Sequence, residues 1–296
     1  MKYSLFLILF FSACTSQPQV IEHLETDIES HLSDIEGTFG VWFQNLDDPD
    51  DHFSINPDTL FHAASTMKTP VMIELFKKAE AGEFSMSDSV LIENEFESIA
   101  DGSSFQLTLD PDGDDPYEAR VGKNATIYEL IHAMITYSSN LATNLMIQLA
   151  DAEETTQTMR DLGAESIEVL RGVEDLKAFD RGLSNRTTPR DLGIILQAMA
   201  EGRAVSPESD STMIEIMKDQ FYRDIIPLHL PESIEIANKT GFITGVRHDS
   251  AIVYLPDGRS YVFIYLSKDL NNEEEGRLAG AEISRKIYDF VMKNGL

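Results

Sequence analysis

The sequence predicts an α/β (α+β) fold: a mostly antiparallel five-stranded sheet flanked by terminal helices, plus an all-helical lobe. Two observations support this class. Segments rich in strand-forming residues lie towards both ends of the chain, at 37–43, 52–55, 234–241, 250–255 and 261–267. The middle of the chain instead carries apolar residues at helical spacing. Strands from both ends can share one sheet only if the ends meet, so we expect a discontinuous sheet lobe.

The turns and the final helix have clear local signals. Residues 47–51 form a turn that lets 52–55 pair back as a hairpin, and Pro256-Asp257-Gly258-Arg259 is a strong turn between the last two strands. Asn272 can cap a C-terminal helix, whose first turn holds three glutamates suited to the positive end of the helix dipole. Apolar residues then recur at every fourth position, which are Ala279, Ile283, Ile287 and Val291.

Helices in the middle of the chain also begin at recognisable residues. Thr126 and Glu129 have the spacing of a capping box, and Thr188 precedes a proline at the first helical position. Residues 140–149 carry leucines at helical spacing. We therefore place a discontinuous α/β lobe at 22–64 and 225–296, and a helical lobe at 65–224 with an acidic insertion at 93–124.

The N-terminus predicts export. Lys2 precedes a short apolar run at 3–11, and small residues lead to Cys14, the only cysteine of the chain. This pattern resembles a bacterial lipobox, so we expect a lipoprotein-type signal peptide at 1–14, lipidation of Cys14 and a tether at 15–21. The alternative is a plain secretory signal with an incidental cysteine. The expected protein is a membrane-anchored lipoprotein facing the periplasm or the cell exterior.

Charge and composition limit the partners. The chain has 296 residues, 42% of them hydrophobic, and a net charge of −28, which argues against nucleic acid and anionic membrane surfaces. We expect a monomer that contacts the membrane only through its lipid anchor. We expect no cofactor and no metal, because Asp110 to Asp115 lacks the glycine and glutamate positions of an EF-hand and the histidines show no zinc-binding pattern. Those aspartates predict an acidic surface loop.

A serine and a lysine three residues apart are the first candidate for chemistry. On a helix, Ser65 and Lys68 would be neighbours about 5–6 Å apart at Cβ. A serine hydroxyl needs an adjacent base, and lysine can serve only if its pKa falls from about 10.4 towards about 7. Burial beside another cation can cause such a fall. Alone, this pair also fits an ordinary helix start.

Two later motifs strengthen that candidate. Ser138-Ser139-Asn140 follows an apolar helical run, and Lys239-Thr240-Gly241 begins a strand-like region. With the first pair, in this order, they make the chain resemble the class A β-lactamase-like serine hydrolases of the β-lactamase and penicillin-binding protein superfamily. The resemblance covers about residue 22 to the C-terminus. Ser139 departs from the usual aspartate, at a position whose role in the family is mainly structural.

The resemblance implies a role for each motif residue. Ser65 would attack a lactam or acyl carbonyl, Lys68 would hold or remove its proton, and Ser138 would bridge the two lysines and pass a proton to the leaving nitrogen. Asn140 would donate to Lys68 or to the substrate amide. The substrate carboxylate would be bound by Lys239 and Thr240. Arg247 would either add a second carboxylate anchor or be an exposed arginine in a hairpin turn. Gly241 would leave room for substrate, and the N–H groups of Ser65 and Phe242 would hold the oxyanion.

The base for deacylation is less clearly marked. The family pattern Arg-x-Glu-x-x-Leu-Asn aligns with residues 171–177, but this register puts Val173 where the glutamate belongs and Lys177 where the asparagine belongs. A slip of one residue gives Glu174 the role of water activator; otherwise Glu174 is a structural loop carboxylate. The function expected is a secreted β-lactamase-type amide hydrolase. The alternatives are a related D,D-peptidase or esterase, or a non-turnover penicillin-binding or sensor protein.

Overall fold

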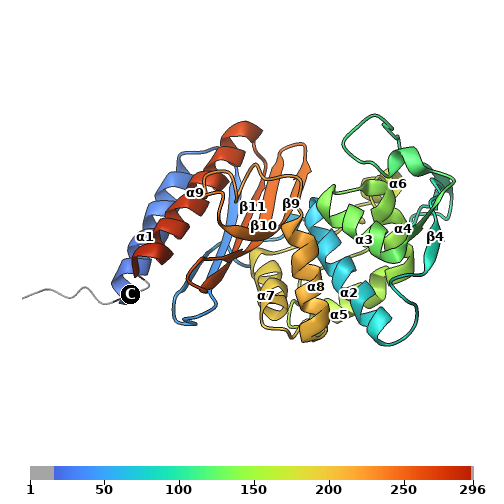
Figure 1. The fold of residues 1–296 in the computed structure, drawn as a ribbon. Helices are drawn as coiled ribbons and strands as arrows, with labels where there is room; N and C mark the ends of the chain where they lie inside the picture. Colours follow the sequence, from blue (N-terminus) through green and yellow to red (C-terminus); the bar gives the residue numbers. More distant parts are fainter. Residues whose placement is uncertain (1–16, 295–296) are drawn as a thin grey trace, which may run out of the picture.

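One antiparallel sheet forms the frame of the molecule in the computed structural model, which describes residues 17–294. Its strand order is β2-β1-β11-β10-β9, and every neighbouring pair is antiparallel (Figure 1). The strands are β1 (Thr38–Asn45), β2 (His52–Ile55), β9 (Glu235–Ile243), β10 (Val246–Tyr254) and β11 (Ser260–Lys268). The first strands of the chain pair with the last, so the predicted fold class and the five predicted strands are confirmed.

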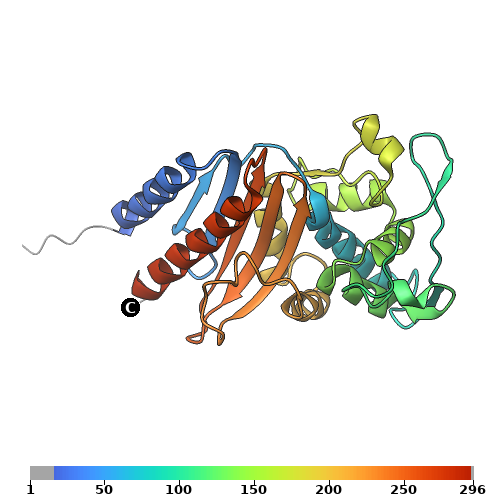
Figure 2. The same cartoon turned by 90° about the horizontal axis from the view of Figure 1, so that it is seen from above.

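The two terminal helices cover one face of this sheet. Helix α1 (Gln17–Ser33) and helix α9 (Glu273–Asn294) lie side by side against it, seen from above in Figure 2. Aromatic side chains fill the layer between helices and strands, with Phe43 packed against Tyr261 and Phe290. The predicted C-terminal helix is confirmed.

The stretch predicted as a tether overlaps the first helix. Helix α1 begins at Gln17, so most of the stretch expected as a tether at 15–21 is helical. Its apolar Ile21 and Ile28 are buried in the layer against the sheet, and this burial favours helix over a free linker. Cys14 and the predicted signal peptide lie outside the described residues. Within residues 17–294, no helix is long and apolar enough to span a membrane.

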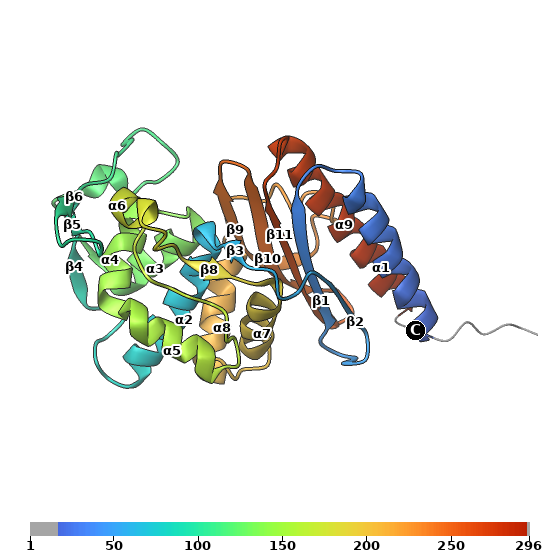
Figure 3. The ribbon, with the colours of Figure 1, turned by 180° about the vertical axis from the view of Figure 1, so that it is seen from behind.

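The helical lobe packs on the opposite face of the sheet (Figure 3). Its core is continuous with the inner face of the strands, from Met72 and Ile131 to Ile252 and Ile264. The Thr126–Glu129 capping box begins α3 as predicted, and Pro189 is the first residue of α7. The helices are α2 (Lys68–Glu80), α3 (Ile127–Thr136), α4 (Asn140–Ala150), α5 (Ala152–Asp161), α6 (Leu176–Asp180), α7 (Pro189–Ala200) and α8 (Pro207–Lys218).

The segment predicted as an acidic insertion carries short paired strands and packs on a neighbouring loop. Strand β4 (Ser89–Leu91) pairs with β7 (Asn124–Thr126), and β5 (Phe96–Glu97) pairs with β6 (Ser104–Phe105), with a 3₁₀ turn, η2 (Glu118–Arg120), before β7. Ser98 donates to Asp175 at 2.7 Å, and the N–H of Ile99 donates to the same carboxylate at 3.0 Å. The insertion therefore supports the loop that contains Glu174.

Candidate active site

The predicted nucleophile lies on a short turn in front of a helix. Ser65 belongs to the 3₁₀ turn η1 (Ala64–Met67), and Lys68 is the first residue of α2. The predicted common helix face is thus a 3₁₀ turn continued by an α-helix. Strand β9 runs directly beside this turn, since a Cβ atom at Gly241 would lie 3.2 Å from the backbone nitrogen of Ser65. A side chain at 241 would therefore crowd the Ser65 turn, and glycine favours the close approach of β9 to this turn.

Lys68 is fully buried and held by three acceptors. Its Nζ donates to the Ser138 carbonyl at 2.7 Å, to Ser138 Oγ at 3.1 Å and to Asn140 Oδ1 at 3.0 Å. Burial, and then the charge of nearby Lys239, hold the pKa of Lys68 well below its usual range. Both effects favour the neutral amine, which is the form of lysine that can act as a base.

Ser138 connects the two buried lysines. Its Oγ lies 3.1 Å from the Nζ of Lys68 and 3.0 Å from the Nζ of Lys239. Burial lowers the pKa of Lys239 to about 7, although Asp249 acts in the opposite direction. A hydroxyl shared by two amines of lowered basicity can pass a proton between them. The structure thus brings together Ser138, Lys68 and Lys239 in the arrangement the resemblance implied.

The other two residues of the second motif have separate tasks. Ser139 is buried and caps α4, its Oγ accepting the N–H of Ala142 at 3.0 Å, which agrees with the structural role expected at this position. Asn140 is oriented differently from the prediction. Lys68 donates to its Oδ1, while its own Nδ2 donates to Glu174 at 3.0 Å. Asn140 therefore links the candidate acylation base to the candidate deacylation base.

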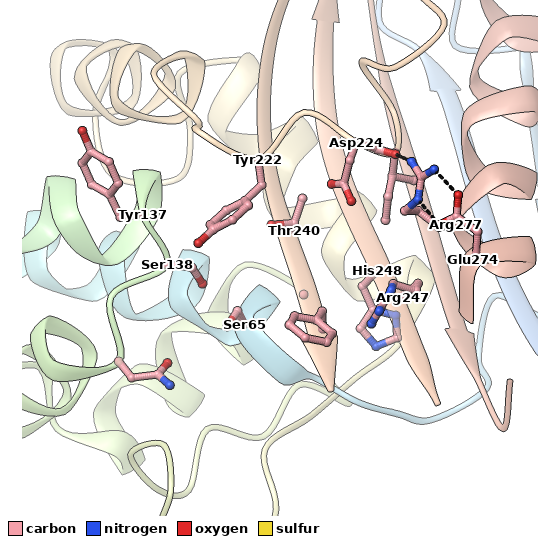
Figure 4. A pocket seen from close by; sticks show the side chains of 14 residues that line it. Ser65, Tyr137, Ser138, Tyr222, Asp224, Thr240, Arg247, His248, Glu274 and Arg277 are labelled. Carbon is pink, nitrogen blue, oxygen red and sulfur yellow. Dashed lines mark hydrogen bonds and ion pairs between the residues drawn. The ribbon is translucent and has the colours of Figure 1, made fainter. Parts of the chain in front are cut away.

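A cleft of about 570 Å³ opens between β9 and the helical lobe. Figure 4 shows Ser65, Ser138 and Thr240 facing it, with Tyr137 and Tyr222 on the side of the helical lobe. Gly241 and the exposed Phe242 complete the wall formed by β9. A second cavity of about 410 Å³ adjoins it on the side of Glu174, and Ser65, Asn140 and Phe242 line both. The predicted binding residues therefore surround the predicted nucleophile.

Arg247 also lines the cleft, but it already has an anionic partner. Its guanidinium forms an ion pair with Glu273 at 2.5 Å and stacks 4.2 Å from the centre of the Phe242 ring. Arg247 lies in β10 opposite Phe242, so it is a positioned side chain rather than a loosely exposed one. Its charge is partly neutralised, which weakens it as a second carboxylate anchor.

The loop with Glu174 is fixed by buried side chains. Arg171 donates to the carbonyl of Leu183 at 2.8 Å, and Asn185 Oδ1 accepts the N–H of Leu170 at 2.8 Å, which closes the loop at its base. Asn144, from buried helix α4, accepts the N–H of Val173 at 2.7 Å and donates to its carbonyl at 3.0 Å. Val173 and Glu174 both line the smaller cavity with Ser65.

Lys177 does not take the place of a water-holding asparagine. It lies in α6 and forms an ion pair with Asp101 of the insertion at 3.3 Å and a hydrogen bond with Ser103. This contact fastens the loop to the insertion. Glu174 is therefore the carboxylate of the loop that reaches the motif residues, through Asn140.

Backbone strain is concentrated at this site. Among the described residues, six other than glycine have positive φ angles, and three of them are Ala64 (46°), Ser138 (54°) and Glu174 (63°). Such conformations cost of order 1–3 kcal/mol and persist where the surrounding contacts hold them. Ala64 precedes the nucleophile Ser65, Ser138 carries the bridging hydroxyl, and Glu174 carries the loop carboxylate.

Sequence reasoning missed three residues at the site. Tyr222 lines the large cleft but belongs to a tract with no motif. His248 is fully buried in β10, lines the same cleft and donates from Nε2 to the carbonyl of His62 at 2.9 Å. His62 lines the smaller cavity, and its position three residues before Ser65 was its only available signal.

Comparison with known proteins agrees with this geometry. The profile of the Beta-lactamase enzyme family matches residues 23–291. A β-lactamase of Rhodobacter capsulatus is 27% identical over 76% of this chain and 73% of its own length. The β-lactamase PSE-4 of Pseudomonas aeruginosa is 24% identical over 98% of both chains.

Solved structures agree as well. PBP-A superposes with a TM-score of 0.77 at 26% identity, covering 92% of this chain and 96% of its own. A β-lactamase of Sphaerobacter thermophilus superposes with a TM-score of 0.75 at 25% identity, covering 93% and 97%. A mutant of PBP-A is known as an acyl-enzyme complex with penicillin-G. The chain therefore belongs to the β-lactamase enzyme family, hydrolases that act on the amide bond of β-lactams.

Proposed function

We propose that this protein hydrolyses β-lactams through a covalent acyl-enzyme on Ser65. One observation carries the proposal: Ser138 Oγ lies 3.1 Å from Lys68 and 3.0 Å from Lys239, in a cleft that Ser65 lines. Both lysines are fully buried, and the lowered pKa of Lys68 supplies the neutral amine that proton transfer requires. Family membership supplies the substrate class.

In the acylation step, neutral Lys68 takes the hydroxyl proton of Ser65 as Oγ attacks the lactam carbonyl carbon. The tetrahedral oxyanion is held by the backbone N–H groups of Ser65 and Phe242, on the facing η1 turn and β9. When the C–N bond breaks, Ser138 gives its proton to the leaving nitrogen and regains one from Lys68. The bond formed is the ester of Ser65, and protons are conserved.

In the deacylation step, Glu174 takes a proton from water, and the resulting hydroxide attacks the ester carbonyl. The carboxylate of Glu174 lines the same cavity as Ser65 and is oriented by Asn140 at 3.0 Å. The Ser65 oxygen leaves and takes up the proton that Glu174 removed from water, which restores the Glu174 carboxylate, and the product is the ring-opened amino acid. Charged Lys239 binds the substrate carboxylate in both steps.

A second candidate is a penicillin-binding protein that stays acylated. It is favoured by the one-residue offset of the loop, because Asn144 holds the backbone of Val173 rather than that of Glu174. The similarity to PBP-A, whose mutant forms a complex with penicillin-G, points the same way. A D,D-peptidase or esterase would use the same residues on an acyl-peptide or ester.

Intact-protein mass spectrometry after mixing with a penicillin tests the proposal. We expect a transient adduct of the mass of the whole penicillin on the wild type, followed by return to the free mass and release of the ring-opened product. Ser65→Ala should show no adduct. A stable adduct without product would favour the second candidate, whereas an adduct at another serine in the Ser65→Ala variant would overturn the assignment of Ser65.

The compartment is part of the proposal. We propose that the protein is exported and that Cys14 carries its lipid anchor. Lys2, the short apolar run and the small residues before Cys14 support this. Stable anchoring takes more than one acyl chain, and a bacterial lipoprotein carries several on its N-terminal cysteine.

A further inference from the structure

The turn that contains Ser65 is stabilised by a hydrogen bond to the side chain of His62. The Nδ1 of His62 accepts the N–H of Ala64 at 3.0 Å. Ala64 has a φ of 46°, a conformation that L-residues rarely adopt without support. The N–H of Ala63, one residue earlier in the chain, donates to the Asn185 carbonyl at 2.9 Å. The residue before the nucleophile is thus held in a strained conformation, and His62 holds its N–H.

His62 is itself held on both sides. Its carbonyl accepts from Nε2 of the fully buried His248 at 2.9 Å, and Nδ1 of His248 accepts the N–H of Ser267 at 3.1 Å. The His62 ring contacts Phe179 edge to face, with ring centres 6.1 Å apart. The His62 backbone thus contacts the sheet, while its imidazole connects the Ser65 turn to Phe179 of α6.

We propose that His62 is a positioning residue for acylation: as a neutral imidazole it fixes the Ala64 N–H and so the Ser65 turn, and its protonation releases that turn. The inference rests on the proposed acyl-enzyme function of Ser65. An Nδ1 atom that accepts a hydrogen bond has no proton, so the tautomer carries its proton on Nε2. Adding a second proton at Nδ1 would place two N–H groups against each other at 3.0 Å.

The groups around His62 keep it neutral near pH 7. Burial, and then the Arg171 guanidinium, lower the pKa of His62 below its usual 6.5. His62 lies in the short strand β3 (Phe61–His62), which pairs with β8 (Arg186–Thr187), and the charge of its partner Arg186 is balanced by Glu168. Two further titratable groups lie near His62. Glu174 lines the same smaller cavity as His62, and neutral His248 donates to the His62 backbone carbonyl. The acceptor is therefore present at neutral pH and is lost as the pH falls through the lowered pKa of His62.

Two substitutions separate the hydrogen bond from the bulk of the ring. His62→Asn places the amide oxygen Oδ1 where Nδ1 was and does not titrate. His62→Phe keeps the ring against Phe179 but has no acceptor. His23→Asn is the matched control, because His23 is an exposed histidine of α1, on the opposite face of the sheet.

Single-turnover acylation by a fluorescent penicillin, measured from pH 4.5 to 8, tests the proposal. We expect His62→Asn to acylate at pH 7.5 within about threefold of wild type, and His62→Phe about 3- to 10-fold more slowly, the effect of one lost neutral hydrogen bond. As the pH is lowered, the acylation rate of wild type and of His23→Asn should fall more steeply than that of His62→Asn. In His62→Asn, only the protonation of Lys68 should still lower the rate. Identical acid limbs in wild type and His62→Asn, or full activity of a folded His62→Phe, would overturn the proposal.

A second measurement does not depend on the substrate. In NMR spectra of the wild type, the Ala64 amide signal should move with the titration of the His62 ring, and this movement should be absent in His62→Asn. If the wild type never acylates, the proposed function fails while the NMR titration still decides the hydrogen bond. If the wild type acylates but the Ala64 signal ignores the titration, the positioning role alone fails.

Discussion

The side chain of Asn144 hydrogen-bonds both backbone polar groups of Val173: it accepts the N–H at 2.7 Å and donates to the carbonyl at 3.0 Å. Because Asn144 is buried in α4, this contact sets the register of the whole loop. The next residue, Glu174, has a φ of 63°, and its carboxylate reaches Asn140. Glu174 lies one residue after the position where the family pattern places its glutamate. The Asn144 contact and the backbone conformation at Glu174 nevertheless bring its carboxylate to the site.

Glu174→Gln should acylate at a near-normal rate and then stall. Glutamine can still accept from Asn140, so the loop keeps its geometry, but it cannot take a proton from water. General-base assistance contributes about 10²–10⁴-fold, so deacylation should fall by that factor alone. Stopped-flow acylation and time-resolved mass spectrometry measure the two steps. Glu165→Gln, an exposed carboxylate outside the site, is the control; unchanged turnover in Glu174→Gln would show a purely structural loop.

Val173→Glu should accelerate deacylation. Val173 lines the cavity beside Ser65 and is held by Asn144 through its backbone alone, so a carboxylate can replace its side chain there. We expect a gain of about tenfold or more in the deacylation rate, within the range of general-base effects. The double variant Val173→Glu with Glu174→Gln should retain the gain. If neither variant deacylates faster while both acylate normally, residue 173 does not face the ester.

Lys239→Arg should change the alkaline side of the pH profile. Lys239 has a pKa of about 7, so it loses its charge as the pH rises through that value, and binding of the substrate carboxylate should weaken. Arginine stays charged, so its alkaline limb should move to higher pH. The readout is the shape of kcat/KM between pH 6 and 10 at constant ionic strength. Parallel alkaline limbs in both proteins would assign the titration to another group.

His248 should make the fold sensitive to acid. Burial lowers its pKa to about 4, below the value of about 6.5 expected in the unfolded chain. Because the pKa is lowered in the folded protein, the contribution of His248 to the free energy of unfolding is fully present above pH 6.5. This contribution is lost as the pH falls towards 4.

Between pH 7 and 4.5, this loss should amount to about 2–3 kcal/mol. The non-titrating His248→Gln should lack this component, while carboxylate effects are common to both proteins and cancel. Urea unfolding at the two pH values gives the comparison. An equal loss in wild type and variant would exclude His248 as the cause.

Cys14→Ser should release the protein from the membrane. The acyl chains on Cys14 are the predicted anchor, and the mature chain would lose them. Fractionation of expressing cells, with detection by antibody, measures the change. An unchanged membrane fraction would indicate another anchor.

Local chemistry made much of the fold predictable. The Thr126–Glu129 capping box, Pro189 at the start of α7 and the turn before β11 act over a few residues, so sequence alone locates them. The sheet followed because alternating, strand-forming segments at both chain ends have to bury their apolar faces together. The same locality explains the wrong boundaries. Strand β10 begins at Val246 rather than at residue 250, and burial of Ile21 and Ile28 against distant strands turns most of the expected tether into helix.

The order of the motifs in the chain was enough to predict four site residues, which are Ser65, Lys68, Ser138 and Lys239. The chemistry of these residues, however, depends on the folded structure. The lowered pKa of Lys68 needs complete burial beside Lys239, which lies far away in the sequence. The contact of Glu174 with Asn140 depends on the hydrogen bonds of Asn144 to Val173, and the neutral state of His62 depends on burial and then on the charge of Arg171. Side-chain identity is a local property, whereas desolvation, charge proximity and hydrogen-bond direction arise only when distant segments pack together.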